Sequence, residues 1–211
     1  MKQLRLALTL LLVLAACGND GTPATAPLPP GASALGLEAY AGDGFSMLLP
    51  ESWVVVTADD LDVGAMLEFL PEGFDEALGP EMLEQIEGLF SQGGKLIAFD
   101  FSGPSLEFTD NLNIIEAPLP PVSIAVAESA NVQYVKEVFG VTDIESEIRS
   151  LPAGEAFIIR YNLPPALGST QGMVVNILTE TKHWAFTLSA ADVDRHLEVF
   201  EMMVESFREA P

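Results

Sequence analysis

Short hydrophobic segments separated by turns occupy residues 144–189, and they constrain the fold more than any other feature. Residues 144–149 alternate between hydrophobic and polar, and Leu-Pro-Ala-Gly at 151–154 predicts a turn into a returning strand at 156–161. A second pair of strands, 172–180 and 183–189, is joined across Thr181-Lys182. Because strands joined by short turns run antiparallel, this region predicts a largely antiparallel sheet.

Helical spacing of hydrophobic residues marks three further segments. The spacing predicts one helix over residues 80–90, a second that ends at Phe139 before Gly140, and a third over residues 193–207. The third is the clearest, because its hydrophobic residues step by four, three, four and three, and Ser189 and Asp192 precede it in a capping-box-like spacing. Helices between and after hairpins predict an α+β domain, with one mostly antiparallel sheet flanked by helices.

The domain is expected to begin at Gly44. Residues 45–49 alternate, residues 50–52 predict a turn, and Trp53 to Val56 would return as the second strand of a hairpin. Residues 96–101 and 112–116 are expected to form two more strands. We therefore predict a single domain over residues 44–211.

The first seventeen residues have the layout of a secretory leader. Lys2 and Arg5 precede an apolar run at 6–14, which is too short to anchor the chain across a bilayer. The ending Leu-Ala-Ala-Cys resembles the lipobox of bacterial lipoproteins. The resemblance implies a signal peptide over residues 1–16, cleavage between Ala16 and Cys17, and lipidation of Cys17 with acyl chains such as palmitate. The alternative is an ordinary cleaved leader with a cysteine nearby.

Residues 17–43 are rich in Pro, Gly, Ala and Ser and show no periodic apolar face. They predict a flexible tether between the lipidated Cys17 and the domain. The protein is therefore expected to be exported and held at the cell envelope. Because Gly18 rather than aspartate follows Cys17, similarity to enterobacterial lipoproteins implies the outer membrane, or the outer face of the plasma membrane in a cell with one membrane.

The chain is strongly acidic, with a net charge of −22 from 9 basic and 31 acidic residues. Such a surface repels nucleic acid and anionic lipid, so neither is an expected partner. Attachment to the membrane is expected through the acyl chains on Cys17 alone. Cationic partners stay open, and so does the simpler explanation that the acidity keeps an exported domain soluble.

Two ends of the domain resemble PsbP-like domains. Gly44-Phe45-Ser46-Met47-Leu48-Leu49-Pro50 followed by Trp53 resembles their opening strand, and Phe200 with Ser206-Phe207-Arg208 resembles their terminal helix. The resemblance implies an α/β/α sandwich over residues 44–208. Similar domains serve as extrinsic photosystem proteins, a nuclear GTPase-binding protein and bacterial lipoproteins, so it also implies a binding role without catalysis.

Catalytic motifs are absent from the sequence. No Gly-x-Ser-x-Gly elbow or phosphate-binding loop occurs, and Cys17 is the only thiol. His183 and His196 are the only histidines, and each is expected to be an exposed or packed side chain rather than a base. The sequence therefore predicts a protein that is not an enzyme and has no cofactor.

Metal-binding motifs are absent as well. No His-x-x-x-His or Cys cluster suits zinc. Asp59, Asp60 and Asp62 come nearest to a calcium site, but the twelve-residue loop with its central glycine and last glutamate is missing. No metal is therefore expected.

Aromatic side chains offer one further candidate site. Trp53, Tyr161, Trp184 and Phe186 would either line a pocket for an apolar or sugar ligand or pack in the core. Taken together, the sequence predicts an accessory or protein-interaction module of a membrane complex. The alternative is an envelope protein that binds a small ligand or cation. A hydrolase built on two carboxylates is the third hypothesis.

Overall fold

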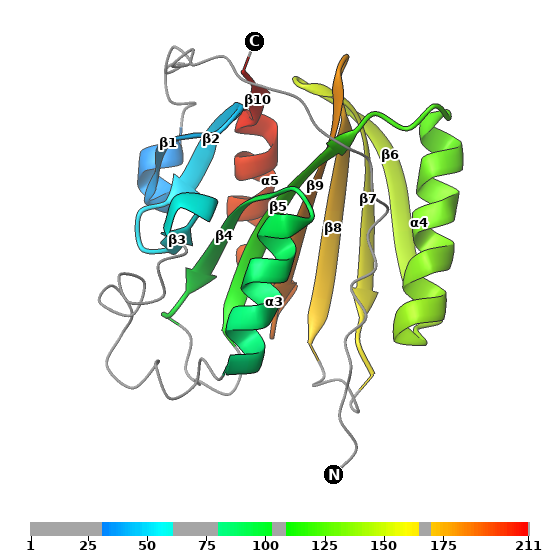
Figure 1. The fold of residues 1–211 in the computed structure, drawn as a ribbon, viewed down its shortest axis with the longest axis horizontal. Coiled ribbons are helices and arrows are strands. Elements are labelled where there is room, and N and C mark those ends of the chain that lie inside the picture. The colour runs from blue at the N-terminus through cyan, green and yellow to red at the C-terminus, as the bar shows by residue number, and fades with distance from the viewer. Residues whose placement is uncertain (1–30, 61–79, 103–108, 165–169, 211) are drawn as a thin grey trace.

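The computed structural model describes residues 31–60, 80–102, 109–164 and 170–210, and these form two antiparallel sheets (Figure 1). The larger sheet has the order β3-β4-β5-β9-β8-β7-β6, with β3 (Val54–Val56), β4 (Gly94–Asp100), β5 (Asp110–Pro118), β6 (Ile144–Leu151), β7 (Gly154–Asn162), β8 (Gln171–Leu178) and β9 (Lys182–Ala190). The smaller sheet has the order β1-β2-β10, with β1 (Leu37–Gly42), β2 (Phe45–Pro50) and β10 (Arg208–Glu209).

The helices cover both faces of the larger sheet. They are α3 (Pro80–Ser91), α4 (Ile124–Phe139) and α5 (Leu197–Ser206), with short 3-10 turns η1 (Ala32–Leu35), η2 (Ala58–Asp60) and η4 (Val193–His196). The strand register places Phe99, which packs with α3, on the same face as Tyr161, which packs with α4. Helix α5 and the smaller sheet lie on the opposite face (Figure 1). The α+β class and its sandwich arrangement are therefore confirmed. In the described residues, no helix is long and apolar enough to span a membrane.

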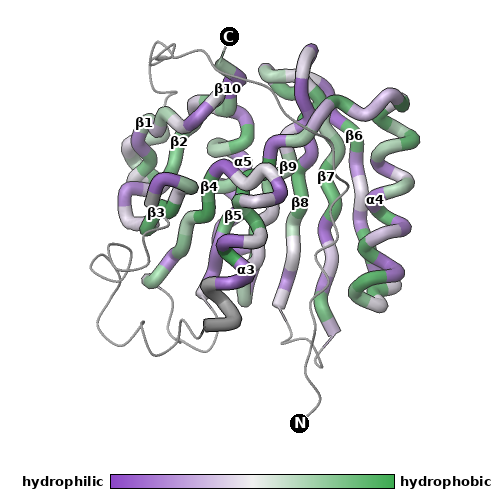
Figure 2. Tube along the Cα trace, in the orientation of Figure 1, coloured by the Kyte–Doolittle hydropathy of each residue, from purple (hydrophilic) through white to green (hydrophobic). Residues whose placement is uncertain are grey.

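The main hydrophobic core lies between the larger sheet and α5, and the smaller sheet closes it. Four aromatic rings meet there with centroids 5.0–6.0 Å apart: Phe45, Trp184, Phe186 and Phe207. Two smaller clusters lie on the opposite face under α3 and α4. Figure 2 shows long hydrophobic stretches in β7 and β8 and an alternation of hydrophobic and hydrophilic residues along α4. Strands β7 and β8 are therefore buried on both faces over much of their length, whereas the edge strand β6 is mostly exposed and α4 is covered on one side.

The predicted hairpin between residues 45–49 and 53–56 was wrong. Strand β2 pairs with β1 and β10, whereas β3 pairs with β4 in the other sheet. The turn after Pro50, in which the Trp53 amide donates to the Pro50 carbonyl, leads the chain from one sheet to the other. Since both edges of β2 are already paired, β3 has no free edge to join there.

The folded domain begins before Gly44. Both η1 and β1 lie within residues 17–43, for which we predicted a flexible tether without secondary structure. Strand β1 pairs with β2 along its whole length, and Asp43-Gly44 forms the hairpin turn with Gly44 at φ +81°. The strand gives no hydrophobic pattern because it lies at the edge of its sheet and only Leu37 is buried.

The remaining elements follow the sequence patterns. The predicted helix over residues 80–90, the left-handed stop at Gly140 and the hairpins over residues 144–189 are all present. The last helix begins with η4, a 3-10 turn capped by the Asp192 side chain, which accepts from the Asp194 amide. Ser189 belongs to β9 and does not take part in the cap.

Candidate functional site

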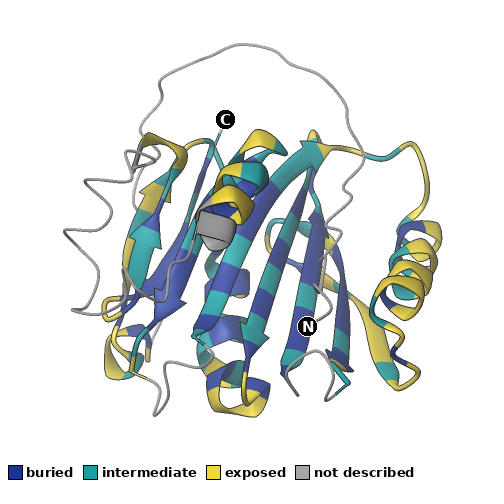
Figure 3. Cartoon of the chain, turned by 60° about the horizontal axis from the view of Figure 1, so that its bottom comes forward, coloured by how far each residue is buried: buried dark blue, intermediate teal, exposed yellow. Residues whose placement is uncertain are grey.

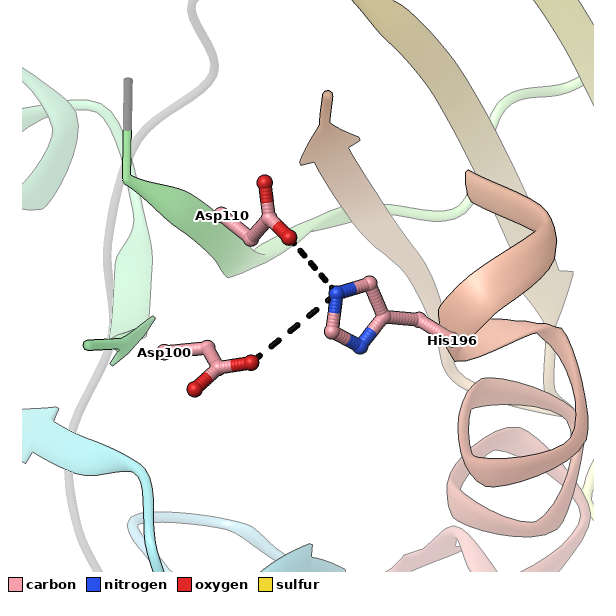
Figure 4. Close-up of side chains that lie close together, drawn as sticks. All are labelled: Asp100, Asp110 and His196. Carbon is pink, nitrogen blue, oxygen red and sulfur yellow. Dashed lines mark hydrogen bonds and ion pairs between the residues drawn. The ribbon is translucent and has the colours of Figure 1, made fainter. Parts of the chain in front are cut away.

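The structure brings Asp100, Asp110 and His196 together at the end of the larger sheet (Figure 4). Asp100 is the last residue of β4 and Asp110 the first of β5, and the two are direct partners in the antiparallel ladder. Their register places them on the face that carries α5. His196, the last residue of η4, lies over this pair because η4 follows β9, the neighbour of β5.

The imidazole points at both carboxylates. Its Nε2 lies 2.7 Å from Asp110 Oδ2 and 3.9 Å from Asp100 Oδ2. The three residues are only 4–6% exposed, so the interaction is shielded from water. Charge-assisted hydrogen bonds between a carboxylate and a ring N–H are strong in such surroundings.

Backbone amides fix the other oxygen of each carboxylate. The Ala191 amide donates to Asp110 Oδ1 and the Ser102 amide donates to Asp100 Oδ1, both at 2.9 Å. Arg195 donates to Ser102 Oγ at 3.0 Å, and its Nη2 lies 3.7 Å from Asp100 Oδ2. The carboxylates are therefore held in fixed orientations by the strands and the loop before η4.

One aromatic ring packs against a side of the cluster. The Trp53 ring stands edge-on to the His196 ring, with centroids 5.7 Å apart and an angle of 79° between the planes. Burial against Trp53 limits the rotation of the imidazole. The site thus contains two oriented carboxylates and one oriented ring nitrogen, and it is largely shielded from solvent.

The cluster is suited to bind a cation rather than to form a covalent intermediate. Covalent catalysis needs a nucleophile that hydrogen-bonds to the imidazole. Within the part of the chain that the structure describes, the polar contacts of the His196 ring are the two carboxylates. Two carboxylates and an imidazole are instead a common set of metal ligands.

Sequence reasoning missed this cluster. We expected His196 to be an exposed or packed side chain, and it is buried beside two aspartates that lie 86 and 96 positions earlier in the chain. Spacing within the sequence carries no signal for such a site. The only feature of the sequence that could indicate the site is an aspartate at the end of each of two neighbouring strands. The last pair of this antiparallel ladder is Asp100 and Asp110, so their carboxylates lie together. We did not find it because we predicted these strands to end at other residues.

The four candidate aromatics do not line one pocket. Trp53, Trp184 and Phe186 are buried in the main core, whereas Tyr161 lies across the sheet, stacked on Phe139 under α4. Burial raises the pKa of Tyr161 to about 12, with a smaller contribution from Tyr134. All four side chains are buried.

The structure describes only some of the other candidate residues. Asp59 lies exposed on η2 and Asp60 ends that turn, while Asp62, Ala16 and Cys17 fall outside the described residues. His183 is half-buried on β9, with Nε2 2.7 Å from Asn176 Oδ1. Burial lowers the pKa of His183, so its ring is favoured in the neutral form.

No family model and no curated protein sequence matches the chain significantly. Among solved structures, the chain is similar to cyanobacterial PsbP (CyanoP) from Synechocystis, with 18% identity, a TM-score of 0.50, and coverage of 93% of this chain and 99% of that one. It also matches LpqN, involved in cell envelope biogenesis of Mycobacterium tuberculosis, with 10% identity, a TM-score of 0.45, and coverage of 79% and 83%. The likeness to CyanoP shows that the chain has a PsbP-like fold.

Proposed function

We propose that the chain is a lipid-anchored protein of the cell envelope that serves as a protein-interaction or accessory module of a membrane complex and catalyses no reaction. The leader pattern that ends at Cys17 supports export and acylation. The anchor would hold the domain at the outer membrane, or at the outer face of the plasma membrane where that is the only one. The PsbP-like fold supports a binding role, since similar domains act by binding.

One observation carries the proposal: the large hydrophobic side chains that are exposed among the described residues gather around α4. They are Leu119, Val122, Val126, Tyr134, Val138 and Ile148, and we call them the α4 face. Ile148 belongs to it because its ladder partner Phe157 packs under α4. Figure 3 shows this helix largely exposed, beside the edge strand β6, whose residues are mostly exposed as well. We infer that these side chains form one surface, since exposed hydrophobic residues that lie together mark protein interaction sites.

The surroundings of the α4 face indicate the chemistry of its partner. Three acidic residues lie on α4 or between it and β6: Glu128, Glu137 and Asp143. Lys136 is the basic residue of this helix. A complementary protein surface would have a hydrophobic centre and a rim of lysine or arginine. Anionic lipid lacks that rim, so a protein is the favoured occupant.

Cross-linking of the full-length protein in living cells, followed by mass spectrometry, tests the proposal. The unmodified protein is expected to capture a defined envelope protein, and Cys17→Ala should lose it because the domain is no longer anchored. The double variant Val126→Asp/Val138→Asp should lose it because charge enters the α4 face. Ser33→Asp/Ala34→Asp, which adds the same two negative charges at exposed residues of η1, is the matched control and should retain the partner.

Two outcomes would reject the proposal. Equal capture by the unmodified protein and by the double variant would exclude the α4 face as the binding surface. Capture of no envelope protein by any form would remove the accessory function itself.

The second candidate function is binding of a small ligand or cation at the envelope. It is favoured by the buried cluster of Asp100, Asp110 and His196, whose donor atoms all lie within 4.8 Å of one another. A thermal-shift screen of the full chain with metal ions, sugars and lipids tests it, because a ligand that binds only the folded state raises Tm. A flat screen would count against it.

A further inference from the structure

We propose that Asp100, Asp110 and His196 form a binding site for one divalent first-row transition-metal ion, such as Zn²⁺ or Mn²⁺. The proposal deepens the second candidate function and is independent of the α4 face. It gives this protein a ligand class that its sequence motifs do not indicate. The site would hold the ion between the end of the β4–β5 ladder and the last residue of η4.

The first argument is the orientation of the carboxylates. Each aspartate has one oxygen fixed by a backbone amide, from Ser102 to Asp100 Oδ1 and from Ala191 to Asp110 Oδ1. The second oxygen of each is then directed at His196 Nε2 (Figure 4). Outer hydrogen bonds that orient the ligands in this way are a regular property of metal sites.

The second argument is the loose contact of Asp100 Oδ2. A single ring N–H serves only one carboxylate, and Asp110 Oδ2 takes it at 2.7 Å. The contacts of Asp100 Oδ2 with Arg195 Nη2 and His196 Nε2 measure 3.7 and 3.9 Å, and both are longer than a hydrogen bond. A cation between the three donors would give this oxygen a short contact.

The third argument is charge. Two aspartates directly opposite in a ladder repel each other, and here both are buried. The Arg195 side chain is 43% exposed and contacts only the Asp100 side of the pair, so it balances the repulsion in part. A divalent ion between the carboxylates would balance both.

The distances suit an ion after a small adjustment. Bonds of about 2.1 Å to a tetrahedral ion hold neighbouring donors about 3.4 Å apart. The observed separations from Nε2, 2.7 and 3.9 Å, lie on either side of that value. The imidazole nitrogen favours a transition metal, since Ca²⁺ and Mg²⁺ prefer sites made of oxygen alone.

The test is metal binding by the full chain purified in detergent. With a net charge of −22, the surface attracts any cation weakly, so binding is measured at physiological salt with excess Mg²⁺. We expect about one tightly bound Zn²⁺ per chain, and with Co²⁺ as the probe we expect visible absorption bands typical of low-symmetry coordination.

The variants locate the binding. Asp100→Asn and His196→Gln should each weaken Zn²⁺ binding by more than about tenfold and remove the Co²⁺ bands, as loss of a ligand does. His183→Gln, which changes the other histidine, is the matched control and should bind normally. Circular dichroism without metal checks that each variant folds. If His196→Gln does not fold, the Zn²⁺ affinity of Asp100→Asn decides the test. This variant is expected to fold because asparagine keeps the oxygen that accepts from the Ser102 amide.

Two results would overturn the proposal. One is the absence of tight Zn²⁺ binding by the unmodified chain. The other is binding that Asp100→Asn leaves unchanged, which would assign the ion to surface carboxylates. Neither result would affect cross-linking through the α4 face, so the two proposals fail separately.

Discussion

Helices α5 and α4 pack on opposite faces of the same sheet and differ in what covers their outer side. Helix α5 lies between the larger sheet and β2, and its Phe200, Met203 and Val204 are buried in the main core. Helix α4 is four turns long, yet only Ala127 and Val135 are buried, and its Val126, Tyr134 and Val138 are exposed. A helix enclosed on two sides contributes mainly to stability, whereas a helix enclosed on one side retains an exposed surface.

The largest expected effect tests this difference directly. Phe200→Ala should lower the free energy of unfolding by about 3–5 kcal/mol, because it removes a fully buried ring from α5. Val126→Ala on the exposed side of α4 should change it by less than about 0.5 kcal/mol. Urea denaturation of the full chain measures both. Equal losses would mean that the two helices are equally integral to the core.

The inner side of α4 can be examined through Tyr161. Since the folded pKa, about 12, lies above the ordinary value of 10.0, the protonated phenol stabilises the fold, fully below pH 10. This contribution is lost as the pH rises from 10 to 12. Tyr161→Phe should therefore reduce the loss of stability over that range by up to roughly 2–3 kcal/mol. Stability curves of the unmodified chain and of Tyr161→Phe at several alkaline pH values measure it. A pH dependence that Tyr161→Phe leaves unchanged would contradict burial of Tyr161.

A partly buried hydrogen bond joins α5 to the smaller sheet, and we expect it to stabilise the packing of the two elements. The Leu48 amide donates to Ser206 Oγ at 2.8 Å, and this hydroxyl donates in turn to the Met203 carbonyl. Ser206→Ala should cost about 1–3 kcal/mol, since the amide loses its partner where water is largely excluded. Denaturation measures the loss, and Ser129→Ala on the exposed side of α4 should have almost no effect. A neutral Ser206→Ala would show that packing alone holds the two elements together.

The smallest effect is expected at the exposed contact between the two sheets. The hydrogen bond from Lys95 holds the pKa of Asp43 below its ordinary value of 3.8, so the contact stabilises the fold above that pH. The stability is lost as the pH falls below 3.8. Because the Asp43 side chain is 84% exposed, Asp43→Asn should lower the stability at neutral pH by less than about 0.5 kcal/mol. A loss comparable to that of Ser206→Ala would mean that surface charge, rather than packing, attaches the smaller sheet.

Local patterns in the sequence were sufficient for most of the fold. The hairpins over residues 144–189 and the stop at Gly140 were predicted because alternation and a left-handed glycine are local signals. Strand β1 was missed because it buries little, and the partner of β2 was misassigned because register between sheets is not a local property. The candidate site was missed for the same reason, since His196 and the two aspartates meet only after β4, β5 and β9 have paired.

Strand β10 has a consequence for the order in which the domain is completed. It pairs Arg208 and Glu209 with Ser46 and Phe45, and the Ala210 amide donates to the Gly44 carbonyl. A ribosome makes β2 early and its second neighbour more than 150 residues later, so one edge of β2 stays open throughout elongation. The edge of β2 therefore cannot be closed until β10 has been made, and until then β2 offers a free edge to chaperones or to other unfinished chains.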